Sequence, residues 1–341
     1  MKGILSLVDG QLGQLDRWYF AYHCLRNRHA PAMFHQGWGS QEAIDALNAS
    51  WASPRPASLP VITWDDEWLA SGQGFAVRNG RFRTPADTKY LPHESHTAYF
   101  RFVQPHGVES HDVVLLTPAS REAGVEARMP IARDLAMKGI STVLLESPFM
   151  GRRQSPRQIG TMLSHFSDFL VLSAASIEEA RSLTAWLCRQ PFSSVCVAGI
   201  SKGGYLATVA GLRSPENVKV VSIVGPHSGV PVLLEGLLGT LCDWDLLQRS
   251  SGSSKPVRQH VAEVFEQTSL ERLPLPGPGK RLITIGARND RYVPASSLTR
   301  MQTHWGPHAD VRWLPGGHVS SIAERGHLVN TIVEALTPRR L

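Results

Sequence analysis

The sequence is poor in cysteine and in metal-binding patterns. Its four cysteines are Cys24, Cys188, Cys196 and Cys242. They lie far apart, and none belongs to a CxxC or CxxH spacing, so a disulfide framework or a structural zinc site is not expected and a reducing compartment fits. The histidines show no HExxH spacing either. We therefore expect no bound metal.

Long hydrophobic runs are also missing. No run approaches the ~18 apolar residues that a membrane-spanning helix needs. Between Lys2 and Asp9 only six residues are available as the core of a signal peptide, which is too short. We therefore expect a cytoplasmic protein without a transmembrane segment, for which peripheral contact with a membrane stays open. The sequence does not indicate an oligomeric state.

Signals for nucleotide cofactors and nucleic acids are absent. The chain contains neither a P-loop nor a GxGxxG fingerprint, so no nucleotide cofactor is indicated. Its net charge is +6, from 35 basic and 29 acidic residues among 341. This modest excess, with no RNP motif, zinc finger or basic helix, argues against nucleic acid as a partner. We expect no cofactor and a small-molecule partner.

From residue 113 onward, short apolar runs that end in Gly, Pro or Ser alternate with helical stretches. The runs are 113–118, 142–147, 194–201, 220–226, 281–287 and 311–317, and the helical stretches are about 125–138, 161–189, 202–213, 294–306 and 319–335. This alternation predicts an α/β fold with a mostly parallel central sheet and helices on both faces. Before it, 74–85 and 96–105 alternate in hydropathy and predict a hairpin-like pair, with a turn at Asn79-Gly80.

Two segments do not follow the alternation. Residues 1–70 are rich in Trp, His, Arg and Pro, and we interpret them as short helices that form an N-terminal extension packed on a core of residues 71–341. Residues 227–278 begin with a Leu-rich stretch, 230–241. We interpret this segment as a cap or lid inserted over the carboxyl edge of the sheet, where ligands bind in such folds.

The strongest local motif is Gly199-Ile200-Ser201-Lys202-Gly203, a GxSxG between a predicted strand and a predicted helix. A nucleophile elbow needs glycines on both sides of the serine, because the turn leaves no room for neighbouring Cβ atoms. The alternative is a glycine-rich turn with an incidental serine. The strand before the motif and the helix after it favour the nucleophile.

The backbone around this serine supplies candidate oxyanion donors. The N–H of Lys202 would lie at the start of the helix that follows Ser201, where it can stabilise a developing negative charge. A second donor is expected in the loop after 113–118, from the N–H of Ala119 or Ser120. That loop has no HGGG motif, so its residue types alone do not favour one of the two.

Two further strand ends carry an acid and a base. Asp290 follows the run 281–287, and His318 follows a double glycine after the last run. The order Ser201, Asp290, His318 is that of an α/β-hydrolase triad. His318 would accept the serine proton, and Asp290 would hold the imidazole tautomer. Taken singly, the Asp could be a helix cap and the His a packing residue; the alternative acids, Asp243 and Asp245, lie in the insertion.

Basic residues are expected around the mouth of this site. The candidates for substrate binding are Arg152, Arg153, Arg288 and Arg291, together with Lys202 at the elbow. Arginine suits a bidentate grip on carboxylate or phosphate, so an anionic head group is one interpretation. A solvated basic rim is the other. Similarly, 230–241 could line an acyl pocket or form ordinary cap core.

Blocks outside the triad resemble the alpha/beta hydrolase domain-containing protein 18 branch of the α/β-hydrolase fold. The similar segments are FHQGWGSQEAIDAL (34–47), GRFRTPA (80–86), STVLLESPFMGRRQSPRQ (141–158), FSDFLVLSAASIEEA (166–180), CDWDLL (242–247) and GGHVSSIAERG (316–326). The resemblance spans about 34–337 and implies that Ser201, Asp290 and His318 occupy the nucleophile, acid and base positions. Two departures are Lys202, where the branch has Met, and an oxyanion loop that lacks its Gly-Thr-Gly-Asp-like stretch.

The residues and the resemblance together predict a serine hydrolase that cleaves a carboxylic ester or similar acyl bond through an acyl-serine intermediate. A basic rim and a leucine-rich cap favour a lipid-like or anionic substrate. Two alternatives stay open: a non-catalytic α/β-hydrolase scaffold that binds a ligand or partner, and an acyltransferase that uses the same triad.

Overall fold

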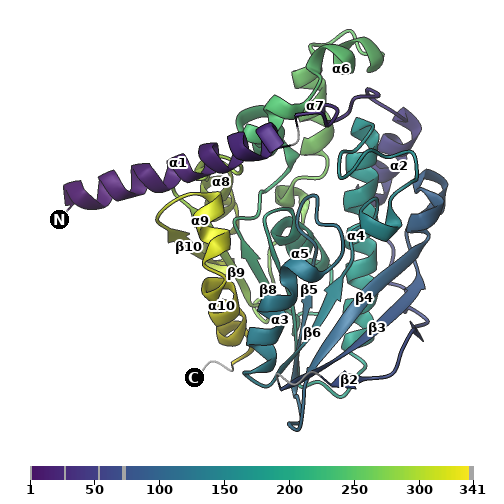
Figure 1. Cartoon of the computed structure of the whole chain (residues 1–341), viewed down its shortest axis with the longest axis vertical. Coiled ribbons are helices and arrows are strands. Elements are labelled where there is room, and N and C mark those ends of the chain that lie inside the picture. The colour runs from purple at the N-terminus through teal and green to yellow at the C-terminus, as the bar shows by residue number, and fades with distance from the viewer. Residues whose placement is uncertain (1, 27, 53, 71–73, 338–341) are drawn as a thin grey trace.

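The computed structural model describes residues 2–26, 28–52, 54–70 and 74–337, with the side chains of 2–12 and 70 outside the description. Its centre is one ten-stranded sheet with the order β1-β3-β4-β6-β5-β7-β8-β9-β10, in which β2 pairs with β3 (Figure 1). The strands are β1 Thr63–Trp64, β2 Leu69–Ala70, β3 Phe75–Arg83, β4 Thr97–Pro105, β5 Asp112–Leu116, β6 Ile140–Leu145, β7 Ser194–Ile200, β8 Lys219–Ile223, β9 Leu282–Ala287 and β10 Asp310–Leu314.

The predicted fold class is confirmed. Strands β5 to β10, which correspond to the six apolar runs, are parallel, while β1 to β4 form an antiparallel edge that joins through β4 and β6. The carboxyl ends of the parallel strands therefore meet at one edge of the sheet. Any chemistry carried by residues that follow these strands gathers there.

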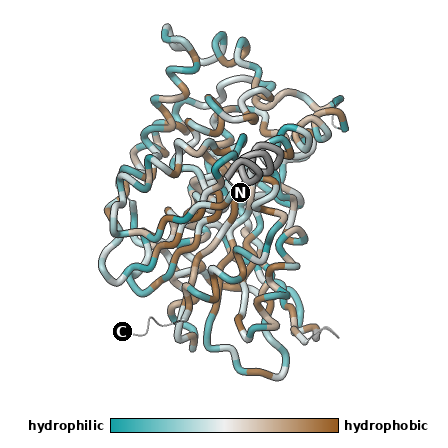
Figure 2. Tube along the Cα trace, turned by 90° about the vertical axis from the view of Figure 1, so that its left-hand side faces the viewer, coloured by the Kyte–Doolittle hydropathy of each residue, from teal (hydrophilic) through white to brown (hydrophobic). Residues whose placement is uncertain are grey.

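Helices bury both faces of the sheet. Helices α3 (Met129–Ala136) and α10 (Gly326–Leu336) cover one face, and α4 (Phe166–Leu187) and α5 (Lys202–Leu212) cover the other (Figure 1). Side chains on β5 alternate between these two cores: Val114 and Leu116 pack with α3 and α10, and Val113 and Leu115 pack with α4 and α5. This is why the strands are continuous hydrophobic runs, visible as the brown centre of Figure 2.

The expected turn at Asn79-Gly80 is wrong, because both residues lie inside β3. The backbone N–H and the side-chain amide of Asn79 each donate to the Asp66 carboxylate at 2.8 Å. Gly80 faces Phe100, whose ring would lie 2.5 Å from a Cβ at that position. The glycine therefore makes room for an aromatic ring on the neighbouring strand, and the chain turns instead between residues 84 and 96.

Several helices differ from the expectation. The N-terminal region contains one long helix, α1 (Lys2–Arg26), followed by α2 (Gln41–Ala52), instead of several short helices. Residues 63–70 supply β1 and β2 to the sheet. The predicted helix over 319–335 is divided into α9 (His318–Ala323) and α10. Helix α1 packs on α9, so tertiary contacts support a helix that contains helix-weakening glycines.

The chain between β8 and β9 forms short elements, α6 (Trp244–Ser250), α7 (Val257–Glu266) and single turns at Pro231–Glu235, Leu237–Leu241 and Leu270–Arg272. We call residues 227–278 the cap. It lies over the edge at which β7 ends and is followed by β9 and α8 (Ala295–Trp305) (Figure 1). Among the helices that the structure describes, none has the length and hydropathy to cross a bilayer.

Candidate active site

Ser201 lies at the sharp turn between β7 and α5. Its φ of 57° and ψ of −127° are unusual for a residue with a side chain. A Cβ at Gly199 would lie 2.4 Å from the backbone carbon of Gly203, and a Cβ at Gly203 would lie 2.9 Å from the carbonyl oxygen of Thr117. The two glycines of the motif are therefore required by close backbone approach, as the sequence predicted. The turn is a nucleophile-elbow geometry.

The structure brings the three predicted side chains of the triad together. His318 Nε2 lies 3.0 Å from Ser201 Oγ, and His318 Nδ1 lies 2.6 Å from Asp290 Oδ2. The other oxygen of Asp290 accepts the backbone N–H groups of Tyr292 at 2.8 Å and Val293 at 2.7 Å. Asp290 and His318 are each 5% exposed. Such a chain of contacts can hold the imidazole with its Nε2 free to accept the serine proton.

The alternative acids are placed elsewhere. Asp243 caps α6, because its Oδ1 accepts the N–H of Leu246 at 2.9 Å. Asp245 lies in the first turn of the same short helix. Neither is the carboxylate that contacts His318.

The candidate oxyanion donors differ in whether their N–H groups already have an acceptor in the structure. The N–H of Ala119 donates to Glu122 Oε2 at 3.0 Å, and Arg128 Nε holds the other oxygen of Glu122 at 2.6 Å. The N–H of Ala119 therefore already has an acceptor in this structure, which makes it the weaker of the two candidates in this loop. Ser120 lines the cavity beside Ser201, and Lys202 is the first residue of α5. These two remain the stronger candidates.

A cavity of about 120 Å³ opens onto Ser201 beneath the cap. Apolar side chains from α2, α4 and the cap line it, among them Leu47, Leu170, Ile177, Leu233, Leu238 and Phe265. Within 230–241, Leu233 is also a buried member of the hydrophobic core beneath the cap, and Leu238 packs against that core. The two interpretations of 230–241, pocket wall and cap core, therefore describe the same side chains.

Lys202 also lines this cavity, although the residue is only 7% exposed. Burial lowers the pKa of its ammonium to about 7, while the nearby Glu122 acts in the opposite direction. The ammonium of Lys202, the residue that follows Ser201, therefore titrates near neutral pH. A methionine at this position, as in the resembling branch, has no group that titrates.

The structure places Arg152 and Arg153, two of the arginines expected at the mouth of the site, against carboxylates instead. Arg153 is fully buried and bonds Glu179, with Nη1 2.9 Å from Oε2. Arg152 pairs with Glu146 at 2.9 Å and its guanidinium lies 4.2 Å from the centre of the Tyr99 ring. Both arginines neutralise carboxylates of the core, and neither lines the cavity.

Arg288 and Arg291 are exposed and do not line the cavity either. The guanidinium of Arg288 lies 5.4 Å from the Trp313 ring centre. The side chains that replace them are Arg121, which donates to Thr161 at 3.0 Å, and Arg213, which lies 4.4 Å from the Trp51 ring centre. Arg121 follows the end of β5 by five residues and Arg213 directly follows α5, so no motif marked them.

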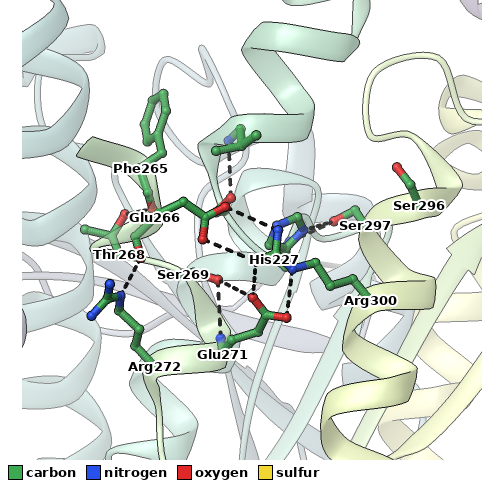
Figure 3. Close-up of polar contacts among 12 residues, drawn as sticks. His227, Phe265, Glu266, Thr268, Ser269, Glu271, Arg272, Ser296, Ser297 and Arg300 are labelled. Atoms are coloured by element: carbon green, nitrogen blue, oxygen red, sulfur yellow. Dashed lines mark hydrogen bonds and ion pairs between the residues drawn. The ribbon is translucent and has the colours of Figure 1, made fainter. Parts of the chain in front are cut away.

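The cap meets the core through a cluster of polar side chains that we call the latch (Figure 3). Arg300 of α8 pairs with Glu266 at 3.2 Å and with Glu271 at 2.5 Å. Beside them, His227 places both its backbone N and its Nδ1 2.9 Å from Ser297 Oγ. Burial lowers the pKa of His227 to about 4, so it is neutral at neutral pH. The latch joins both ends of the cap to α8.

All four cysteines are free thiols. Within the described part of the chain, no group of three or more His, Cys, Asp or Glu side chains is arranged to hold a metal ion.

Comparison with solved structures identifies the fold. Acetyl xylan esterase 1 from Thermoanaerobacterium sp. is 14% identical with a TM-score of 0.58, over 89% of this chain and 97% of that one. Acetyl xylan esterase from Paenibacillus sp. R4 is 12% identical with a TM-score of 0.56, over 86% and 95%. Acylaminoacyl peptidase from Pyrococcus horikoshii is 13% identical with a TM-score of 0.53, over 79% of this chain and 43% of that one. At these identities the likeness shows the fold alone.

The family comparison is more specific. The model of the family described as Alpha/beta hydrolase domain containing 18 matches residues 31–256 and 248–338. These ranges include the elbow, the cap and the segments that carry Asp290 and His318, and they begin after α1. The chain therefore belongs to the alpha/beta hydrolase domain containing 18 family and has the α/β-hydrolase fold.

Proposed function

We propose that this protein is a serine hydrolase that cleaves a carboxylic ester or a similar acyl bond. The observation that carries the proposal is the line of contacts from Asp290 through His318 to Ser201 at the floor of an apolar cavity. The fold likeness to acetyl xylan esterases agrees with this reaction class.

The geometry supports a two-step acyl transfer. Ser201 Oγ attacks the carbonyl carbon as His318 Nε2 accepts its proton, and Asp290 stabilises the imidazolium. The N–H groups of Lys202 and Ser120 would stabilise the tetrahedral oxyanion. His318 then protonates the leaving alcohol, and water, activated by the same imidazole, releases the acid from the acyl-serine.

The cavity suits a substrate with an apolar acyl group and an anionic part. Its walls are mainly aliphatic and aromatic, while Lys202, Arg121 and Arg213 supply basic groups. At about 120 Å³ it is no larger than the ~150 Å³ cavity that holds benzene in another protein, so it admits a short acyl group. A longer, lipid-like chain requires the cap to move.

Peripheral contact with a membrane is also part of the proposal. Helix α1 exposes Trp18, Tyr22 and Leu25, which are 73%, 55% and 69% exposed and follow one side of the helix, next to Arg17 and Arg26. Cosedimentation with vesicles that contain an anionic phospholipid would measure this contact. The variant Trp18→Ser should bind less than the wild type, and equal binding would argue against it.

Labelling with a fluorophosphonate probe tests the hydrolase itself. The wild type should become labelled on Ser201, and Ser201→Ala should not. Ser228→Ala is the matched control, because Ser228 lines the same cavity but bonds the N–H of Val230. If the wild type labels no better than Ser201→Ala while a control hydrolase labels well, the protein is a non-catalytic scaffold.

A second measurement separates hydrolysis from acyl transfer. Nitrophenyl esters of increasing chain length are incubated with and without an alcohol acceptor, and the free acid and the new ester are both measured. A hydrolase should release mainly acid at low acceptor concentrations, because water then reacts with the acyl-serine faster than the alcohol does. A product dominated by the new ester would identify an acyltransferase that uses the same three residues.

A further inference from the structure

A buried carboxylate from the N-terminal helix lies behind the candidate triad. Asp16 of α1 is 0% exposed. Its Oδ2 accepts the backbone N–H groups of Arg291 and His318, each at 2.9 Å, and its Oδ1 accepts the N–H of Val319 at 2.8 Å. The N–H of Arg291 belongs to the loop that carries the acid, and the N–H groups of His318 and Val319 are the first two of α9, which begins with the base.

These three bonds connect two parts of the site to α1. Arg291 directly follows Asp290, and the N–H of His318 belongs to the base itself. The carboxylate of Asp16 therefore joins the loop that carries the acid to the start of α9, which carries the base. In the sequence, Asp16 lies 274 residues before Asp290. Bonds from a charged acceptor to buried N–H groups are stronger than neutral ones and are costly to leave unmade.

The surrounding packing leaves little freedom for this arrangement. A Cβ at Gly317 would lie 2.7 Å from Asp16 Oδ2, and a Cβ at Gly13 would lie 3.0 Å from the Cβ of Asn289. On the next turn of α1, the Phe20 ring lies 6.1 Å from the Tyr292 ring, which in turn lies 5.1 Å from the His318 ring. Helix α1 thus touches the acid loop on both sides of Asp290.

We propose that Asp16 is a positioning residue of the active site, which aligns His318 with both Asp290 and Ser201. The inference rests on the proposed hydrolase function, because it concerns the triad of that reaction. It makes α1, which lies before the residues matched by the family model, a working part of the site. Asp16 touches no reacting atom and acts only through the loop that carries Asp290 and through the start of α9.

The variant Asp16→Asn tests the proposal. An amide keeps one acceptor oxygen but turns its NH2 toward an N–H donor, so at least one of the three bonds is lost. Small misplacements of a catalytic group reduce turnover strongly, so we expect kcat to fall ~10- to 100-fold. The KM for a short nitrophenyl ester should change less than about 2-fold, because Asp16 itself does not line the cavity.

Two further variants separate positioning from a general loss of structure. Asp66→Asn makes the same chemical change at a carboxylate that also accepts two hydrogen bonds, on the antiparallel edge of the sheet. It should keep the wild-type kcat. Gly317→Ala pushes the new Cβ against Asp16 from the other side and should lower kcat in the same way as Asp16→Asn.

The outcomes distinguish this inference from the proposed function. If the wild type does not react with a fluorophosphonate, the hydrolase proposal fails first. If the wild type reacts and Asp16→Asn reacts at the same rate with the same kcat, Asp16 is not a positioning residue. A fall in kcat that is matched by an equal fall in folded protein, measured by thermal unfolding, would also overturn the inference. Should Asp16→Asn not fold, the result for Gly317→Ala decides.

Discussion

The floor of the site and the cap above it are held in place by different kinds of polar contact. On the floor, the carboxylates of Asp290 and Asp16 are buried and accept backbone N–H groups. The latch of the cap relies on side-chain pairs, and Arg300 in it is 42% exposed. Buried charges cannot exchange their partners for water, whereas half-exposed pairs can.

This difference assigns a separate task to each region. On the proposed function, we expect the floor to keep the distances between Ser201, His318 and Asp290 constant, because acyl transfer requires it. The cap lies over an apolar cavity with contacts that cost little to break, so on the proposed function we expect it to be the region that opens for substrate. Four predictions test the comparison.

The largest effect is expected on the floor. Asp290→Asn should lower kcat/KM by about 10³- to 10⁴-fold. The amide would favour the wrong tautomer of the imidazole, and it has no negative charge to stabilise the imidazolium. Asp243→Asn, which makes the same change in the cap, should stay within about 2-fold, since Asp243 caps a helix. Steady-state hydrolysis of a nitrophenyl ester measures both. A similar loss for both variants would contradict the assignment of the acid.

A buried lysine provides the second test of the floor. The pKa of Lys202 is lowered to about 7, so between pH 7 and about 10 the unfolded chain binds a proton that the folded chain does not, and stability rises with pH. Lys202→Met should raise the free energy of unfolding at pH 7 by about 2–4 kcal/mol and remove this rise. Urea unfolding of both proteins at several pH values measures the free energy of unfolding and its rise with pH. Lys219→Met should retain the rise, and its loss there would contradict the explanation.

Acidification tests the cap side. His227 has its pKa lowered to about 4 by burial, with Arg300 adding to this and Glu266 and Glu271 opposing it. Between pH 6.5 and 4 the unfolded chain therefore binds the extra proton, and stability falls as pH falls. The loss between pH 7 and pH 5 should be about 1–2 kcal/mol greater for the wild type than for His227→Gln. Parallel pH profiles of the two proteins in urea unfolding would argue against a role for this histidine.

The smallest effect on stability is expected at the latch itself. Arg300→Met removes two half-exposed ion pairs and should cost at most about 1 kcal/mol. It should nevertheless speed proteolytic cleavage within residues 227–278 about 5-fold, because cleavage follows the population of the open cap. Arg312→Met is the matched control, since Arg312 also pairs with two carboxylates, Asp310 and Glu334, away from the cap. Equal cleavage rates in both variants would contradict the latch.

The errors of sequence interpretation share a physical origin. Arg152 and Arg153 follow a strand end, as functional residues do, but Glu146 and Glu179 lie close enough to neutralise them. Asn79-Gly80 has the composition of a turn, but Asp66 and Phe100 hold it in a strand. Glu179, Asp66 and Phe100 are distant in the sequence from the residues they contact, so no local pattern contains them. Glu146 lies only six residues before Arg152, and there the path of the chain after β6 brings the two side chains together.

The alternation of apolar runs and helices determined the fold class, because a strand buried on both faces must be hydrophobic throughout. The GxSxG motif and the strand-end positions of Asp290 and His318 determined where the three side chains of the triad meet, because parallel strands end at one edge. Only the tertiary structure decided which charges reach the cavity and which carboxylate supports the triad. Asp16, Arg121 and Arg213 acquire their places through packing between segments that are far apart in the chain, and such contacts leave no periodicity or spacing in the sequence.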